Sequence, residues 1–445
     1  MCFNAAKSWQ LGWYDDKSSE VKPEDGAFTG DLSAFVDYKN VPTGGNVLIK
    51  VGTKYLIFNK AKGINAETQE FANAITITDM PRDGDFSDAV GSLGSNGATY
   101  RFGHSGSTAI IELCSTQNTG GVETAKISIY MEGTGSSCGF VGVGVVEKDG
   151  SGPGTSRTTD LFECILIEIA EEFEGQNTEY EHACVAEGDN GEYYKRYHID
   201  DNNSKILPKL KEQDLDLLHH SNQYKVTMTN VVLESDSVVG TTPGTEIVVE
   251  DMGSDFENNS RRLKSVGIRT IVIVRVTTSD GQVSKTASQI ADAFFGVGGD
   301  SNNLKSRYAD CSMDKLTFNP GTGHDFVDGV AEISVSAAAV GANILDFQAK
   351  ITDALLAKYG SSLRNTYNHV VYSVPKGTTM GAGGSDRWIA FAYMNSYLSV
   401  YNDDNIVYIS NQVHETGHNL GLMHSNHGEQ KYGDQSGTMG YGYGQ

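Results

Sequence analysis

The run VHETGHNLGLMHS near the end of the chain constrains the fold more than any other segment. His414 and His418 are four residues apart, so on a helix they lie one turn above each other and can reach the same cation. Gly421 can adopt the left-handed conformation that ends a helix and turns the chain. His424, three residues later, can then return as a third ligand. The run therefore predicts a helix that ends in a turn beside a metal site.

These residue types are typical of a hydrolytic metal site rather than a structural one. Three neutral imidazoles leave zinc an open coordination position for water, whose pKa falls to about 7. Glu415 follows the first ligand and is placed to take a proton from that water. A lone HExxH run also arises by chance in inert helices, but the full five-position pattern is much rarer. We therefore predict one catalytic zinc ion held by His414, His418 and His424.

Two other segments are weaker candidates for metal binding. His427 lies three residues beyond His424 and could compete as a ligand, but the spacing from Gly421 favours His424 and leaves His427 as a solvated loop residue. The segment 298–303 could hold calcium through oxygen ligands, although a plain polar loop is the simpler interpretation. The sequence contains no recognisable Ser/His/Asp triad and no phosphate-binding loop.

Length, charge and hydropathy exclude several classes of protein. A chain of 445 residues is too long for one ordinary domain and predicts two or three. Its 34 Lys and Arg against 57 Asp and Glu give a net charge of −23, which repels phosphate backbones and anionic lipid, so we expect no nucleic-acid partner. No run of 18 apolar residues is present, so no membrane span is expected.

Residues 15–148 alternate apolar and polar positions in short runs, which is typical of antiparallel strands. The step at 52–53 has the loop length of a tight hairpin. We predict a β-sandwich or barrel with a disulfide between Cys114 and Cys138. The expected strands include residues 47–49, 55–58, 75–77, 109–113 and 127–130.

A second β-rich module is expected at residues 161–260, after a linker at 149–160 that is rich in Gly, Ser and Thr. Cys164 and Cys184 would form its local disulfide. The dibasic pair 261–262 lies at a polar-to-apolar boundary and is either an ordinary exposed loop or a processing site. The expected strands are residues 164–169, 224–233 and 246–250.

The hydrophobic pattern changes period near Arg269, so residues 261–445 predict a mixed sheet with crossover helices. The acidic run 403–405 offers an N-cap for the helix that carries the histidines. The other expected elements are strands at 270–276, 330–335, 369–374 and 388–394 and helices at 284–295 and 344–359.

HExxHxxGxxH is the metzincin signature, and Met439 follows His424 by fifteen residues in the run YGDQSGTMGYGY, like the Met-turn of that clan. Together, HETGHNLGLMHS and YGDxSxxMG resemble the gametolysin family of zinc endopeptidases, whose best-known members degrade algal cell-wall glycoproteins. The resemblance covers about residues 269–443. It implies a metzincin catalytic domain in a secreted or cell-wall endopeptidase that acts on extracellular or cell-wall proteins and glycoproteins.

The resemblance also implies roles for individual residues. Substrate would lie extended along the edge of the strand at 388–394, with Glu415 as the general base. Met439 would form the hydrophobic floor beneath the metal, although a plain core methionine would be buried in the same way. Tyr441 matches a tyrosine that stabilises the oxyanion in astacin-like and serralysin-like metzincins, and a surface aromatic residue is an equal alternative.

The order of the segments differs from that of the family. Residues 1–14, MCFNAAKSWQLGWY, resemble the piece that closes gametolysin-like catalytic domains after the Met-turn, and residues 15–148 resemble their C-terminal region. A fragment of two tandem protease units would produce this order, and so would a circular permutation. In either case residues 161–260 would be a pro-region. If residues 1–14 dock onto this catalytic domain, Cys2 can reach Cys311.

The location and activity of the chain have alternatives. The first residues contain neither the basic nor the apolar part of a signal peptide, so either the chain is cytosolic or its true N-terminus is missing. The family resemblance favours a secreted protein. A non-catalytic cell-wall or adhesive protein with an incomplete peptidase scaffold is the alternative function, and zinc stoichiometry combined with hydrolysis of casein or gelatin separates the two.

Overall fold

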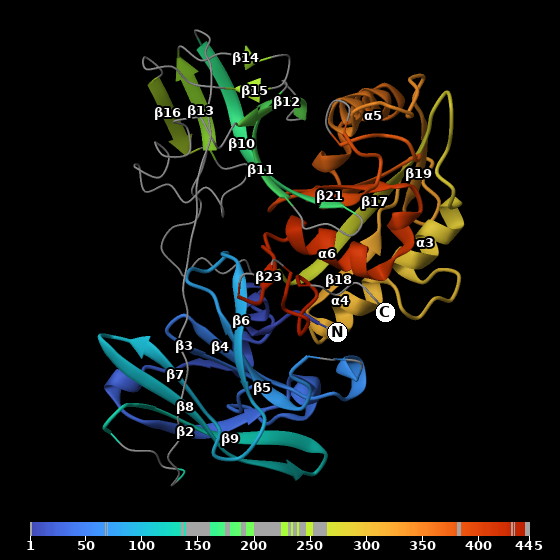
Figure 1. The fold of residues 1–445 in the computed structure, drawn as a ribbon. Helices are drawn as coiled ribbons and strands as arrows, with labels where there is room; N and C mark the ends of the chain where they lie inside the picture. Colours follow the sequence, from blue (N-terminus) through green and yellow to red (C-terminus); the bar gives the residue numbers. More distant parts are fainter. Residues whose placement is uncertain are drawn as a thin grey trace.

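The computed structural model (Figure 1) describes residues 2–440 apart from positions 67, 69, 135–137, 139–160, 381–383, 429 and 431, and between 161 and 264 it describes only the backbone of the strands. Within these residues the chain is a mixed α/β protein whose strands form sheets of six, thirteen and four strands. This agrees with a multidomain α/β fold. The expected linker, the dibasic pair at 261–262, and the side chains of Cys164 and Cys184 lie outside the described residues.

Two sheets from the first third of the chain share one hydrophobic core. Their strands are β1 (Ser18–Glu20), β2 (Phe28–Ser33), β3 (Leu48–Val51), β4 (Lys54–Asn59), β5 (Ala74–Asp79), β6 (Ser87–Leu93), β7 (Thr99–His104), β8 (Ser107–Thr119), β9 (Val122–Met131) and, from far along the chain, β23 (Ser425–Asn426). One sheet has the order β1-β3-β4-β5-β6-β23 and the other β2-β9-β8-β7. Leu56, Ile77 and Ile127 are fully buried in the core that both sheets supply.

The sequence pattern predicted the central strands of these sheets well. Val51 and Lys54 lie opposite each other across the hairpin, and Gly52 between them has φ 59°. The Cys114–Cys138 disulfide is also confirmed, with a Cα–Cα distance of 5.1 Å. Strands β1, β2, β6 and β7 were not predicted because they are short or lack a continuous apolar alternation.

The thirteen-stranded sheet joins two segments that the sequence analysis treats as separate modules. Its first strands are β10 (Leu161–Phe173), β11 (Glu179–Glu187), β12 (Tyr193–Ile199), β13 (Tyr224–Thr229), β14 (Leu233–Glu234), β15 (Val238–Val239) and β16 (Glu246–Asp251), followed by β17 (Gly267–Thr277), β18 (Leu316–Pro320), β19 (Val330–Ser334), β20 (His369–Val374), β21 (Trp388–Tyr393) and β22 (Leu398–Asn402). The main order is β14-β15-β12-β11-β10-β21-β22-β20-β17-β18. The two segments meet where β10 runs antiparallel to β21.

Helices cover both faces of the second segment of this sheet. The described helices are α1 (Ala5–Gln10), α3 (Ala287–Phe295), α4 (Leu304–Cys311), α5 (Ile344–Tyr359) and α6 (Ile409–Asn419), with 3-10 turns η1 (Asp15–Lys17), η2 (Pro23–Asp25), η3 (Phe35–Asn40), η4 (Gly63–Asn65), η7 (Leu363–Asn365) and η8 (Asp403–Val407). Phe347 and Ile351 of α5 pack in one core cluster, whereas α3, α4 and α6 contribute to another. Strand β17 pairs in parallel with β18, β19 and β20. Its near-continuous apolar run follows from burial on both faces.

The first fourteen residues dock onto the α/β segment, which confirms the conditional expectation for Cys2. Cys2 and Cys311 form a disulfide with a Cα–Cα distance of 5.4 Å. The Trp13 indole donates a hydrogen bond to the carbonyl of Ser265, and the Tyr14 hydroxyl donates one to the carbonyl of Cys311. No helix among the described residues is long and apolar enough to cross a membrane.

Candidate active site

Helix α6 carries the first two histidines and is held against the sheet at its C-terminal end. It begins at Ile409 without a side-chain cap, so the predicted N-cap at 403–405 is wrong. Those residues form the 3-10 turn η8, and the Asp403 carboxylate instead accepts a hydrogen bond from the Ser284 amide. At the other end, the Asn419 side chain donates to the carbonyls of Tyr393 and Leu398. The helix is thereby aligned with β21 and β22.

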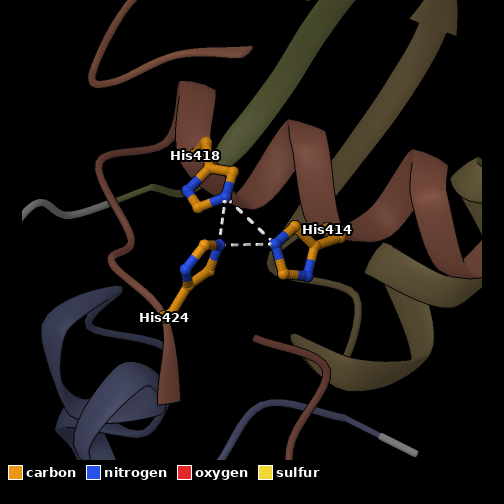
Figure 2. Close-up of side chains that lie close together, drawn as sticks. All are labelled: His414, His418 and His424. Atoms are coloured by element: carbon orange, nitrogen blue, oxygen red, sulfur yellow. Dashed lines mark hydrogen bonds between the residues drawn. The ribbon is translucent and has the colours of Figure 1, made fainter. Parts of the chain in front are cut away.

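His414, His418 and His424 converge on one point in the interior (Figure 2). Their Nε2 atoms are 3.0 Å apart between His414 and His418, 3.0 Å between His414 and His424, and 2.9 Å between His418 and His424. All three side chains are buried. They are the only group of three or more His, Cys, Asp or Glu residues with metal-binding spacing in the described part of the chain.

The Nδ1 atoms of His414 and His418 each contact a backbone carbonyl, and these contacts favour neutral imidazoles whose Nε2 lone pairs face the centre of the histidine group. His414 Nδ1 lies 3.1 Å from the carbonyl of Thr438, and His418 Nδ1 lies 2.8 Å from the carbonyl of Leu422. A carbonyl only accepts, so each Nδ1 donates its proton, and in the neutral ring each Nε2 is then an acceptor. Burial lowers the pKa of His418 well below its ordinary value, and the neighbouring His414 lowers it further.

This donor set fits a zinc ion. Lone pairs that face each other at about 3 Å repel unless a cation lies between them, and a triangle of this size leaves room for an ion about 2 Å from each nitrogen. Neutral ring nitrogens are the form of histidine that binds metals. The turn that brings in the third histidine is formed as predicted, because Gly421 has φ 82° and its amide donates to the carbonyl of His418.

The first residues of the chain support this turn, which the sequence analysis did not foresee. The Gln10 side chain donates to the Gly421 carbonyl at 2.9 Å. The Asn4 side-chain nitrogen lies within 3.1 Å of Ser87 Oγ, Ser425 Oγ and Asp434 Oδ2. Strand β23, which directly follows His424, pairs in parallel with β6. The third histidine, His424, is therefore held in place by the N-terminal segment and by the first sheet.

Met439 packs directly against the helix turn between His414 and His418. It is buried, and a Cβ atom added to Gly417 would lie only 2.6 Å from the Met439 sulfur. The Met439 carbonyl accepts a hydrogen bond from the Ser425 amide, which ties the loop to β23. A side chain larger than hydrogen at position 417 would displace Met439 or the helix.

Tyr432 is a residue beside the site that the sequence analysis missed. Its ring centroid is 4.0 Å from that of His424 and 5.8 Å from that of His414, and its side chain is buried. Its backbone has φ 60°, and its amide donates to the Asn426 side chain. The available signal was its place as the first residue of the run YGDQSGTMG. Tyr441, the tyrosine named from the sequence, lies outside the described residues.

The remaining candidates lie as follows. Glu415 is completely buried on α6, next to His414 in the chain. His427 is exposed, forms an ion pair with Glu70 at 3.2 Å and is not part of the histidine group. In the segment 298–303, the calcium candidate, the amides of Gly298 and Asp300 donate hydrogen bonds to the Asp292 carboxylate of α3. Those contacts organise the turn between α3 and α4, as expected of a plain polar loop.

Lys7 is a buried cation of α1 whose ionisation should affect stability. Burial lowers its pKa from 10.5 to about 7, a shift that Asp85, Asp434 and Asp88 partly oppose. In the unfolded chain it would keep its proton to about pH 10.4, so between those values the unfolded state binds more protons and stability rises with pH. We expect the unfolding free energy of the wild type, minus that of Lys7→Met, to increase from pH 7 to pH 10 in urea titrations.

The exposed Lys22 supplies the matched control for this prediction. Lys22→Met removes an exposed lysine in place of a buried one, so the pH dependence found for Lys7→Met is compared with that of Lys22→Met over the same range. A pH-independent difference for Lys7→Met would mean that Lys7 remains charged in the folded protein.

Comparison with known proteins identifies one segment. Residues 269–444 match the family described as Gametolysin peptidase M11. Comparison of the chain with curated proteins and with solved structures gave no significant match. The matched segment begins in β17 and includes the three histidines, Glu415 and Met439.

Proposed function

We propose that this chain, whose residues 269–444 match the gametolysin peptidase family, is a secreted zinc-dependent endopeptidase that hydrolyses extracellular or cell-wall proteins and glycoproteins. The observation that supports this most directly is the buried convergence of three Nε2 atoms in the segment that matches a peptidase family. The two disulfides, Cys2–Cys311 and Cys114–Cys138, favour an oxidising compartment.

His414, His418 and His424 would hold the zinc ion through Nε2. When bound, zinc acts as a Lewis acid that polarises the scissile carbonyl and lowers the pKa of water to about 7. The carbonyls of Thr438 and Leu422 keep the rings of His414 and His418 in the required tautomer. Met439 fixes the loop beneath the ligand turn of α6, consistent with the metzincin Met-turn.

Glu415 would serve as the general base. It takes a proton from the attacking water while the new bond forms between the water oxygen and the carbonyl carbon. The same carboxyl group then passes the proton to the amide nitrogen as the carbon–nitrogen bond breaks. Glu415 is completely buried on α6 and directly follows His414 in the chain, which supports this role.

Strand β21 would align the peptide. It is antiparallel to β22, and the second residue after its end is linked to α6, because the Asn395 amide donates to the carbonyl of His418 at 2.9 Å. An extended peptide can add to such a strand by main-chain hydrogen bonds, which give affinity without a fixed sequence. A peptide bound in this way would have its scissile bond beside the histidine group.

We expect the purified protein to contain one zinc ion per chain and to hydrolyse casein or gelatin, with activity lost on treatment with 1,10-phenanthroline and recovered when zinc is added back. Metal content by mass spectrometry and hydrolysis of a quenched peptide are the measurements. A zinc-loaded chain that cleaves nothing, even when Ala170 and Glu171 are both replaced by proline, would contradict the proposal and favour the non-catalytic cell-wall protein.

A further inference from the structure

The edge of β21 that a peptide would use is already paired. Strand β10 runs antiparallel along it, with Ile169 opposite Tyr393, Ala170 opposite Ala392 and Glu171 opposite Phe391. A register shift follows, after which Phe173 lies opposite Trp388. In Figure 1, β10 descends from the upper strands to reach β21 above α6. The contact is made by a segment more than two hundred residues away in the chain.

β10 is shared between two neighbours along one of its edges. Its first part, Leu161 to Ile165, pairs with β13, and its last part, Ile169 to Phe173, pairs with β21. The other edge is taken by β11, because Ile165 and Ile169 lie opposite Val185 and Glu181. The end of β10 therefore extends beyond β13 and adds to the sheet next to the histidines.

This pairing has the geometry of peptide binding by strand addition. The main-chain groups on the edge of β21 that faces away from β22 can form a ladder with only one strand at a time. A substrate in the same place would have to displace residues 169–173. A tethered strand also competes at an effective concentration that can reach about the millimolar range, well above that of most protein substrates.

We propose that residues 169–173 of β10 are a built-in occupant of the peptide-binding edge of β21 and keep the peptidase latent until the strand is displaced. This inference rests on the proposed function. The enzyme is then active in proportion to the fraction of molecules whose β21 edge is open. If that fraction is about one in ten to one in a hundred, releasing the strand raises kcat/KM by about 10- to 100-fold.

The Cys2–Cys311 disulfide determines how the strand can leave. A single cut between β16 and β17 would leave β10 attached through residues 1–160, which remain bound to the α/β segment by that disulfide. Permanent removal of the strand requires a second cut between β9 and β10. The N-terminal support of the third histidine would stay in place after both cuts.

The test uses the full zinc-loaded chain with Ala170→Pro and Glu171→Pro combined. Successive amides of a strand point to opposite edges, so two consecutive prolines remove one amide from the β21 ladder and one from the β11 ladder. The matched control is Phe162→Pro with Glu163→Pro, in the part of β10 that pairs with β13 and not with β21. We expect a 10- to 100-fold rise in kcat/KM for a quenched peptide in the first variant only.

Two further measurements keep the test decisive if a variant is unstable. Hydrogen exchange should show faster exchange of the β21 amides in the 170/171 variant, with α6 still protected. A synthetic peptide of residues 166–173 should inhibit that variant competitively, whereas a scrambled peptide of the same composition should not.

The outcomes separate the inference from the proposed function. A wild-type enzyme as active as the 170/171 variant, with no inhibition by the peptide, would overturn the latency role and leave the peptidase assignment intact. No hydrolysis in any form, despite one bound zinc and exposed β21 amides, would overturn the proposed function and the latency role together.

Discussion

Glu415→Ala is expected to lower kcat/KM for peptide hydrolysis by about 10²- to 10⁴-fold while the protein retains one zinc ion, because loss of a positioned general base typically costs that much. Glu415 is not one of the three residues whose ligand atoms converge, so its removal leaves the donor set complete. The measurements are zinc content by mass spectrometry and turnover of a quenched peptide. Both are made in the variant that also carries Ala170→Pro and Glu171→Pro.

Two variants make the interpretation of Glu415→Ala specific. Glu415→Gln keeps the volume of a completely buried side chain and should be equally inactive, which separates lost chemistry from a cavity in the core. His418→Ala should lose both metal and activity. Zinc loss from Glu415→Gln, or turnover equal to that of the wild type, would show that Glu415 is not the base.

Local periodicity predicted the elements whose partners lie close in sequence or whose burial is one-sided. The helix at 344–359 was predicted to the residue, because its apolar stripe is regular and Gly360 ends it in the left-handed conformation. Helix α1 was not found, because all six of its residues are buried and no amphipathic period remains. The pairing of β10 with β21 was also missed, since no local pattern specifies a partner strand that far along the chain.

The convergence of His414, His418 and His424 could be predicted, because helix geometry and a glycine turn fix their positions from spacing alone. The surroundings of these histidines could not. Asn4 reaches Ser425 and Asp434 across more than 400 residues, and Gln10 reaches Gly421 in the same way. The start of α6 was placed wrongly for a related reason: an acidic run that fits an N-cap locally has its Asp403 side chain bonded to Ser284.

Removing the Cys2–Cys311 disulfide by the double change Cys2→Ser and Cys311→Ser is expected to cost stability and zinc affinity together. The closed loop spans 309 residues, for which the chain-entropy model gives about 5–6 kcal/mol, an upper bound for a native bridge. The Cys2 carbonyl also accepts hydrogen bonds from the Thr438 amide and hydroxyl, and the Thr438 carbonyl orients His414. Loosening residue 2 should therefore weaken zinc binding by about tenfold, the lower end for outer contacts of a metal ligand.

The second disulfide provides the control that distinguishes a site effect from general destabilisation. Cys114→Ser with Cys138→Ser opens a bridge of sequence separation 24, for which the same model gives about 3–4 kcal/mol. Cys114 belongs to β8, in the sheet that does not include β23, so zinc affinity measured by chelator competition should stay at the wild-type value. Equal losses of affinity in the two double variants would mean that zinc binding follows overall stability. A loss confined to the Cys2 and Cys311 variant would establish that the chain's first residues help to hold the metal ligands.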